Sequence, residues 1–220
     1  MVSTNQVCNS MRILFSLTLL GAILGCFGLV FAQEIFTYQV IIRGKKVGTI
    51  EYHIERGISF TRYTSFFPTQ DGRQQRDAEF WLTPNGKPLL SRKWLPGAHG
   101  ETFVETRYHE TYIEVWLRAP QGRKKMRIKL SSPVFDLESL PFCRELWEKK
   151  DNASPWFSVF IPVSGMIWKG KRHLIAEKEA ETVTRFSVAG EAIIVHSSKE
   201  DKLPQEIHFP ERGYSLYLSP

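Results

Sequence analysis

Residues 36–54 read FTYQVIIRGKKVGTIEYHI, and this stretch decides the fold. Apolar side chains occupy every second position from Phe36 to Ile42 and again from Ile50 to Ile54. A period of two residues places those side chains on one face of an extended strand. The glycine-containing stretch Gly44-Lys45-Lys46 lies between the two runs and has turn chemistry. The pattern therefore predicts a β-hairpin.

The same alternation continues through most of the chain and is interrupted by short turns such as Thr83-Pro84-Asn85-Gly86 and Ala189-Gly190. Short connections between alternating runs are typical of antiparallel sheets. We therefore expect a mainly β fold, with a single curved antiparallel sheet that forms an open barrel or a sandwich. The further strands are expected at residues 58–67, 78–82, 89–94, 103–108, 111–117, 126–130, 156–162, 171–180, 182–188, 191–197, 205–209 and 213–218.

The alternation breaks once, between Val134 and Lys150, where apolar residues recur at mixed spacings of two to four with charges between them. This pattern predicts one short amphipathic helical segment near residues 134–150, either a single helix or two helical turns around Pro141. Phe142 is its expected anchor on the sheet.

Three polar residues in this segment, Asp136, Ser139 and Arg144, form the most specific polar group in the sequence. Asp136 and Ser139 are three residues apart, which is the spacing by which a side chain caps the start of a helix. An ion pair between Asp136 and Arg144 would hold the segment against the sheet. We interpret the group, together with Phe142, as structural; a ligand site is the alternative.

The N-terminal residues 1–32 predict a secretory signal peptide. Arg12 precedes an apolar region at about residues 13–32, and Val30-Phe31-Ala32 ends it with a small residue at the expected cleavage site. Export to the periplasm is the expectation. The alternatives are an uncleaved segment retained in the membrane and lipidation of Cys26, because Ile23-Leu24-Gly25-Cys26 resembles a lipoprotein site. The natural start is either Met1 or Met11.

Residues 33–220 show no linker, repeat or low-complexity tract, so we expect a single mainly β domain. The whole chain has a formal net charge of +6, which is too small to indicate a nucleic-acid partner. Cys143 is the only cysteine beyond residue 32, so this domain has no intramolecular disulfide.

Basic residues concentrate at predicted hairpin turns. If these turns lie at one rim of the sheet, they form a cationic edge that binds anionic lipid or glycan; scattered, solvated turns are the alternative. The candidate rim residues are Lys45, Lys46, Arg123, Lys124, Lys125 and Arg127. A further basic group lies at Lys169, Lys171 and Arg172.

No catalytic or metal-binding motif is found in the sequence. The six histidines show neither His-Glu-x-x-His nor His-x-His spacing, although a metal site could still assemble across strands. Ser164-Gly165 lacks the preceding glycine of a nucleophile elbow. Cys143 next to Arg144 could be a reactive thiolate, but we favour a small buried apolar side chain. We therefore expect neither catalytic residues nor a cofactor.

Several short motifs, in this order, are similar to a bacterial family of exported proteins known as domain of unknown function three-one-zero-eight. The motifs are Tyr38-x-Val40 with Lys46-Val47-Gly48-Thr49, then Val134-Phe135-Asp136-Leu137-Glu138-Ser139, Phe142 with Arg144, Glu177-Lys178-Glu179, and Leu203-Pro204-Gln205-Glu206-Ile207. The resemblance covers nearly all of residues 34–218. The central motif departs from the family's Asp-Pro-Leu-Ser, because Leu137-Glu138 replaces Pro-Leu. The resemblance implies a curved sheet or open barrel like that of lipoprotein carriers, and it implies no established catalytic residues.

These observations favour a non-enzymatic binding or assembly protein of the cell envelope, which holds a lipid-like or otherwise amphipathic ligand on the concave face of the sheet. The alternative is a structural or adaptor protein that binds another envelope protein, and an envelope hydrolase is a third hypothesis. An apolar cavity would favour the first, and a solid core with an exposed apolar patch would favour the second. Peripheral association with the envelope is compatible with both, and neither fixes the oligomeric state.

Overall fold

Fifteen strands form one sheet in the computed structural model, which describes residues 33–68, 74–147, 155–178, 181–198 and 203–219. The predicted signal peptide, residues 1–32, lies outside these residues. No helix in the described part of the chain is long and apolar enough to cross a membrane. The strands are β1 (Gln33–Ile42), β2 (Lys45–Arg56), β3 (Thr61–Pro68), β4 (Gln74–Leu82), β5 (Pro88–Leu95), β6 (Thr102–Tyr108), β7 (Tyr112–Ala119), β8 (Gly122–Lys129), β9 (Val134–Asp136), β10 (Trp156–Ile161), β11 (Met166–Glu177), β12 (Glu181–Val188), β13 (Glu191–Ser198), β14 (Glu206–Phe209) and β15 (Tyr214–Leu218).

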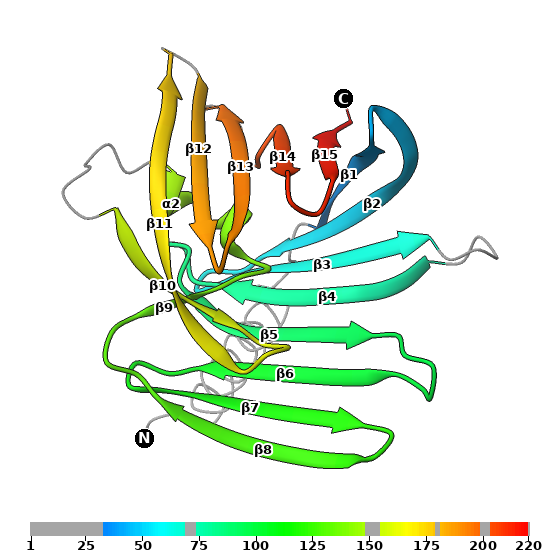
Figure 1. Ribbon diagram of the computed structural model, residues 1–220, viewed down its shortest axis with the longest axis vertical. Helices are drawn as coiled ribbons and strands as arrows, with labels where there is room; N and C mark the ends of the chain where they lie inside the picture. The colour runs from blue at the N-terminus through cyan, green and yellow to red at the C-terminus, as the bar shows by residue number, and fades with distance from the viewer. Residues whose placement is uncertain (1–32, 69–73, 148–154, 179–180, 199–202, 220) are drawn as a thin grey trace, which may run out of the picture. The chain divides into compact units, whose positions relative to one another are not determined.

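The order of the strands in the sheet is β8-β7-β6-β5-β4-β3-β2-β1-β15-β14-β13-β12-β11-β10-β9. Figure 1 shows β3 to β8 following one another side by side. All neighbours are antiparallel except β9 and β10, which are parallel. The sheet is not closed, because β8 and β9 are its two edges. The predicted mainly β, open antiparallel architecture is therefore confirmed.

The first hairpin forms where the sequence predicts it, but its turn is one residue earlier. Ile42 pairs with Lys45, so the two-residue loop is Arg43-Gly44. Both loop residues have positive φ angles, 51° and 77°, as a type I′ turn requires. Lys45 and Lys46 consequently belong to β2 and not to the turn.

The segment predicted as amphipathic helix is a short strand followed by two helical turns. Val134–Asp136 pairs with β10 as β9, so these three residues are extended and the helical prediction is wrong for them. A 3₁₀ turn, η1 (Leu140–Phe142), and a single α-helical turn, α2 (Arg144–Trp147), follow on either side of Cys143. Pro141 stands at the start of η1, which matches the alternative of two helical turns around this proline. Residues 148–150 lie outside the described part.

Strand β11, the second strand of the β10–β11 hairpin, begins earlier than the sequence indicates. The structure places the start of β11 at Met166, whereas the alternation indicated Lys171. Lys169, Lys171 and Arg172 therefore lie within a strand and do not form a basic turn. Arg172 is buried, and its guanidinium donates to the carbonyl of Leu146 (3.1 Å).

Two apolar clusters stabilise the sheet. The larger lies on its inner face, which we define as the face that carries Tyr38, Phe80 and Ile207; the smaller lies between the inner face of β6–β8 and the opposite face of β9 and β10. The larger cluster joins β1–β4 to β12–β15 around residues 137–146, and the smaller joins β6–β8 to β9 and β10. The sheet thus curls so that its two halves contact residues 136–146, which we call the internal segment. This curvature creates the cavity described next.

Candidate functional site

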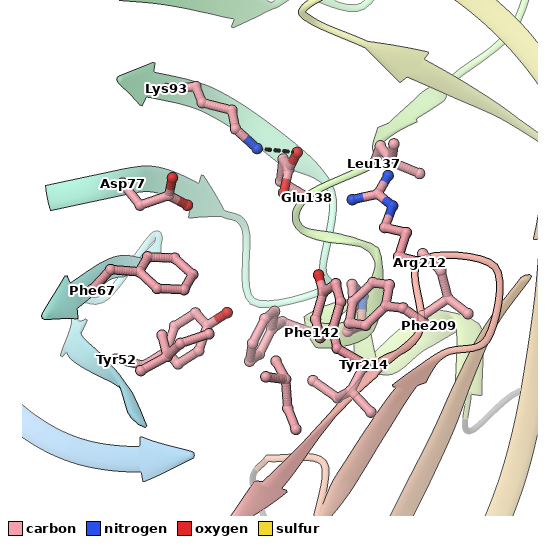
Figure 2. A pocket seen from close by; sticks show the side chains of 15 residues that line it. Tyr52, Phe67, Asp77, Lys93, Leu137, Glu138, Phe142, Phe209, Arg212 and Tyr214 are labelled. Atoms are coloured by element: carbon pink, nitrogen blue, oxygen red, sulfur yellow. Dashed lines mark hydrogen bonds and ion pairs between the residues drawn. The ribbon is translucent and has the colours of Figure 1, made fainter. Parts of the chain in front are cut away.

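A cavity of about 220 Å³ lies between the two halves of the sheet, against the internal segment. Figure 2 shows the side chains that line it. They come from β2–β5, from residues 137–142 and from β13–β15. The lining residues are Ile50, Tyr52, Phe67, Asp77, Lys93, Leu137, Glu138, Pro141, Phe142, Ile193, Ile207, Phe209, Arg212, Tyr214 and Leu216.

One side of the cavity is aromatic. Tyr52 projects inward from β2, and its ring lies 4.9 Å from that of Phe142. Phe209 and Tyr214 stack at 4.6 Å across the turn between β14 and β15. These side chains face inward because alternate residues of a strand point to the same face. They form a wall that suits an apolar or aromatic ligand group.

The other side of the cavity carries charged groups. Lys93 of β5 forms an ion pair and hydrogen bond with Glu138, and Asp77 lies beside them (Figure 2). Asp77 lies at a β-bulge, because Ser65 pairs with Ala78 and Phe66 pairs with Arg76. This extra residue directs its carboxylate toward the cavity. Arg212 reaches the cavity from the β14–β15 turn and is held by Glu191 at 2.7 Å.

Burial and neighbouring charges set the protonation of these groups. Burial by itself would lower the pKa of Lys93, but Glu138 and Asp77 raise it above its ordinary value, so the ammonium stays charged. Burial raises the pKa of Asp77, and the nearby Lys93 only partly opposes this effect. The cavity therefore joins an aromatic wall to a paired, partly desolvated ionic group.

Asp77 and Glu138 are two carboxylates near a lysine, and Glu138 is already engaged by Lys93. Cys143 is fully buried in the core, and its thiol donates to the carbonyl of Ser139 (3.3 Å). Its placement agrees with the expected small apolar side chain.

Asp136, the last residue of β9, begins the internal segment, but with different partners from those expected. Its carboxylate accepts hydrogen bonds from the hydroxyls of Ser91 (2.9 Å) and Tyr108, and from the backbone N–H of Glu138 (2.9 Å). The segment is thus anchored to β5 and β6 through neutral donors, and the predicted ion pair with Arg144 is not what holds Asp136.

Ser139 and Phe142 also act structurally. Ser139 is the N-cap residue of η1 but makes no side-chain cap; its hydroxyl instead donates to the carbonyl of Asp136 (3.1 Å). Phe142 is 5% exposed, and its ring contacts those of Tyr52, Tyr63 and Phe80. Arg144 begins α2 and is exposed.

The candidate basic rim is divided into two groups. Lys45 and Lys46 open β2, whereas Arg123, Lys124, Lys125 and Arg127 lie within the edge strand β8; all six are exposed. Because the strands alternate in direction, the starts of β2 and β8 are at the same end of the sheet. Five strands separate them, however, so the six side chains do not form one continuous patch.

The sequence did not predict the cavity, because its lining comes from distant strands; Phe142 was singled out, but as a structural anchor and not as part of a site. Among the described residues, the cavity contains no group of three metal-ligating side chains. The described part of the chain brings one such group together elsewhere, at His196, Glu206 and His208 on the outer face, opposite the cavity.

Comparison of the chain with models of protein families, with curated proteins and with solved structures finds no match. The resemblance to the exported family therefore stays a prediction.

Proposed function

We propose that this domain is a non-enzymatic binding protein that holds one end of a small amphipathic molecule in the cavity between the two halves of its sheet. The observation that carries this proposal is the pairing of an aromatic wall with the Lys93–Glu138 ion pair in one cavity. If residues 1–32 act as a signal peptide, this binding takes place in the cell envelope.

The size of the cavity limits the ligand. Sites for drug-sized molecules usually measure about 300–1,000 Å³, whereas this cavity measures about 220 Å³. It therefore accepts a short acyl chain or a single aromatic group and not a whole phospholipid. The polar end of the ligand would lie beside Lys93, Asp77 and Arg212.

A chain-length series of alkyl carboxylates tests the proposal, with displacement of a fluorescent apolar probe as the readout. Each buried methylene contributes about 0.8 kcal/mol, so affinity should rise about fourfold per carbon and level off once the cavity is full. Leu137→Trp should abolish binding because the larger ring occupies the cavity. Leu89→Trp is the matched control, since Leu89 is exposed and does not line the cavity.

Lys93→Met gives a second variant that leaves the cavity open. It should lower the affinity for carboxylates more than the affinity for alcohols of the same length. Lys87→Met, at an exposed position, should change neither affinity. A folded protein that binds no member of the series, or equal binding by Leu137→Trp and the wild type, would overturn the proposal.

A second candidate function is peripheral docking on an anionic lipid surface, and one exposed feature favours it. The tip of the β10–β11 hairpin exposes four large apolar side chains, which we call the apolar tip: Val163, Met166, Ile167 and Trp168. Tryptophan next to lysine, here Lys169, suits the boundary between headgroups and acyl chains. A Cβ at Gly165 would lie 3.5 Å from the methyl carbon of Met126, so the tip lies beside the cationic strand β8.

Sedimentation with vesicles of phosphatidylcholine containing phosphatidylglycerol tests this docking. Trp168→Ser and the charge reversal Lys124→Glu should each lower the bound fraction, and salt should lower it as well because it screens exposed charge. Ile58→Ser is the control, since Ile58 is 90% exposed in the connection between β2 and β3. If the wild type does not sediment with these vesicles, docking on lipid is wrong and the adaptor hypothesis takes its place.

A further inference from the structure

Two histidines and a glutamate meet on the outer face of the sheet, where β13 pairs with β14. His196 of β13 is directly opposite Glu206 of β14, and His208 lies two residues further along β14 on the same face. Glu206 Oε2 is 3.0 Å from His208 Nε2 and 3.8 Å from His196 Nδ1. The three ligand atoms all lie within 4.8 Å of one another.

A second group of contacts orients His208. Its Nδ1 lies 2.8 Å from the hydroxyl of Ser215 on β15, which is the cross-strand partner of His208. The Tyr217 ring packs edge-on against the His208 ring at 5.6 Å. When Nδ1 carries the proton and donates it to Ser215, the lone pair of Nε2 points toward Glu206. Metal-binding histidines are commonly oriented in this way by a hydrogen bond to the other ring nitrogen.

We propose that His196, Glu206 and His208 bind one divalent transition-metal ion, with zinc as the best match to two imidazoles and a carboxylate. Zinc binds histidine nitrogen at about 2.0–2.1 Å and carboxylate oxygen at about 2.0–2.2 Å. Tetrahedral bonds of that length place the ligand atoms about 3.4 Å apart, a value between the two distances from Glu206 given above. Small side-chain rotations therefore complete the site, and the fourth position is left to water.

The same sheet supplies an internal comparison. His53 and Glu51 of β2 are also a histidine–carboxylate pair, with Nε2 3.5 Å from Oε2. The other ring nitrogen of His53 contacts the amide of Gln33 at 3.0 Å, and this pair is not part of a three-ligand group among the described residues. This pair tests whether any histidine beside a glutamate on this sheet is sufficient to bind zinc.

The bound ion would join β13 to β14 and stabilise this part of the sheet. An ion that binds only the folded protein raises its melting temperature in proportion to the logarithm of the ion concentration above Kd. This effect gives a readout that does not depend on any activity of the protein.

Titration of the metal-free full chain with zinc chloride, followed by calorimetry and by melting temperature, tests the proposal. We expect one ion per chain and a higher melting temperature with zinc. His208→Ala and Glu206→Gln should each lower the affinity by at least tenfold, and Ser215→Ala should lower it about 10–100-fold through the orientation of His208. Cobalt(II) should show the absorption bands of a tetrahedral site in the wild type and not in His208→Ala.

His53→Ala is the matched control and should leave zinc affinity and the zinc-dependent shift in melting temperature unchanged. The three cysteines of the chain remain in every variant, so binding through their thiols would survive the loss of His208. Zinc binding of equal affinity in the wild type and His208→Ala, or no binding by the wild type, would overturn the proposal.

Discussion

Glu79 and Asp136 are both buried carboxylates, 1% and 0% exposed. The residues around Glu79 stabilise its negative charge, whereas those around Asp136 favour the protonated form. Glu79 is on the outer face of β4 and is surrounded by Arg62, Arg92 and the indole N–H of Trp81 at 2.9–3.1 Å. Asp136 is in the internal segment, where its donors are two hydroxyls and one backbone N–H.

Their pKa values shift in opposite directions as a result. Burial raises the pKa of Glu79, but the Trp81 hydrogen bond and the charges of Arg62 and Arg92 together lower it below its ordinary value. For Asp136, burial raises the pKa, and the hydrogen bonds from Tyr108 and Ser91 do not offset this effect. Burial alone therefore does not decide the ionisation of a carboxylate; the charge of its donors does.

Removing the aromatic anchor of the Asp136 region should have the largest effect. Phe142→Ala should lower the free energy of unfolding by about 3–5 kcal/mol, because it empties a site enclosed by three aromatic rings. Chemical denaturation measures this loss. Phe67→Ala is the control, since Phe67 lines the same cavity but is 39% exposed. A loss below about 1 kcal/mol for Phe142→Ala would mean that the segment is only loosely attached.

Neutralising Glu79 should have the next largest effect. Glu79→Gln should cost about 3 kcal/mol, because it leaves Arg62 and Arg92 close together without their shared buried anion. Glu55→Gln removes the other partner of Arg62, but Glu55 is partly exposed. That control should cost less than about 1 kcal/mol. Equal losses from the two variants would show that burial of the carboxylate is unimportant.

Neutralising Asp136 should have the smallest effect and a distinctive pH dependence. Asp136→Asn should cost less than about 1 kcal/mol at neutral pH, because the amide can bond to the same hydroxyls without a buried charge. The folded protein holds the Asp136 proton more tightly than the unfolded chain. Wild-type stability from this group therefore falls as pH rises from about 3.8 to the raised pKa.

The stability of Asp136→Asn, measured relative to the wild type, should consequently increase as pH rises through that interval. Glu79→Gln should show the opposite trend. The stability that Glu79 contributes to the wild type is lost as pH falls below 4.5, so the difference in stability between this variant and the wild type becomes smaller at low pH. Urea denaturation from pH 3 to pH 8 measures both trends. Parallel curves for the two variants would contradict the assignment of opposite pKa shifts.

The strands could be predicted because alternation is a local signal. Tyr38 lies in the alternating run before the first hairpin turn and Ile50 and Ile54 lie in the run after it, and each is in the core as expected. The β9 strand and the start of β11 were missed for a physical reason. Val134–Asp136 is too short for a period to appear, and Met166–Trp168 is exposed on both faces, so no alternation marks it.

The cavity could not be predicted because its parts are joined only by the curvature of the sheet. Lys93 looks like a surface lysine between Arg92 and Trp94, yet it is drawn inward to Glu138, which is 45 residues away. Asp77 would face outward by simple alternation, and the bulge beside Ser65 turns it inward. No local pattern in the sequence marks either the bulge or the long-range ion pair.

The central position of β1 has a consequence for the order in which the domain forms. Strands β1 to β8 pair in sequence order, so each hairpin can form as soon as its two strands are available. The other side of β1 pairs with β15, with Tyr38 opposite Leu218, and the Tyr38 hydroxyl donates to the carbonyl of Pro204. Contacts between the two ends of this domain form late because they close the largest loop. One edge of β1 thus stays unpaired until β15 has formed. A variant truncated before β15 would leave that edge free to pair with another molecule.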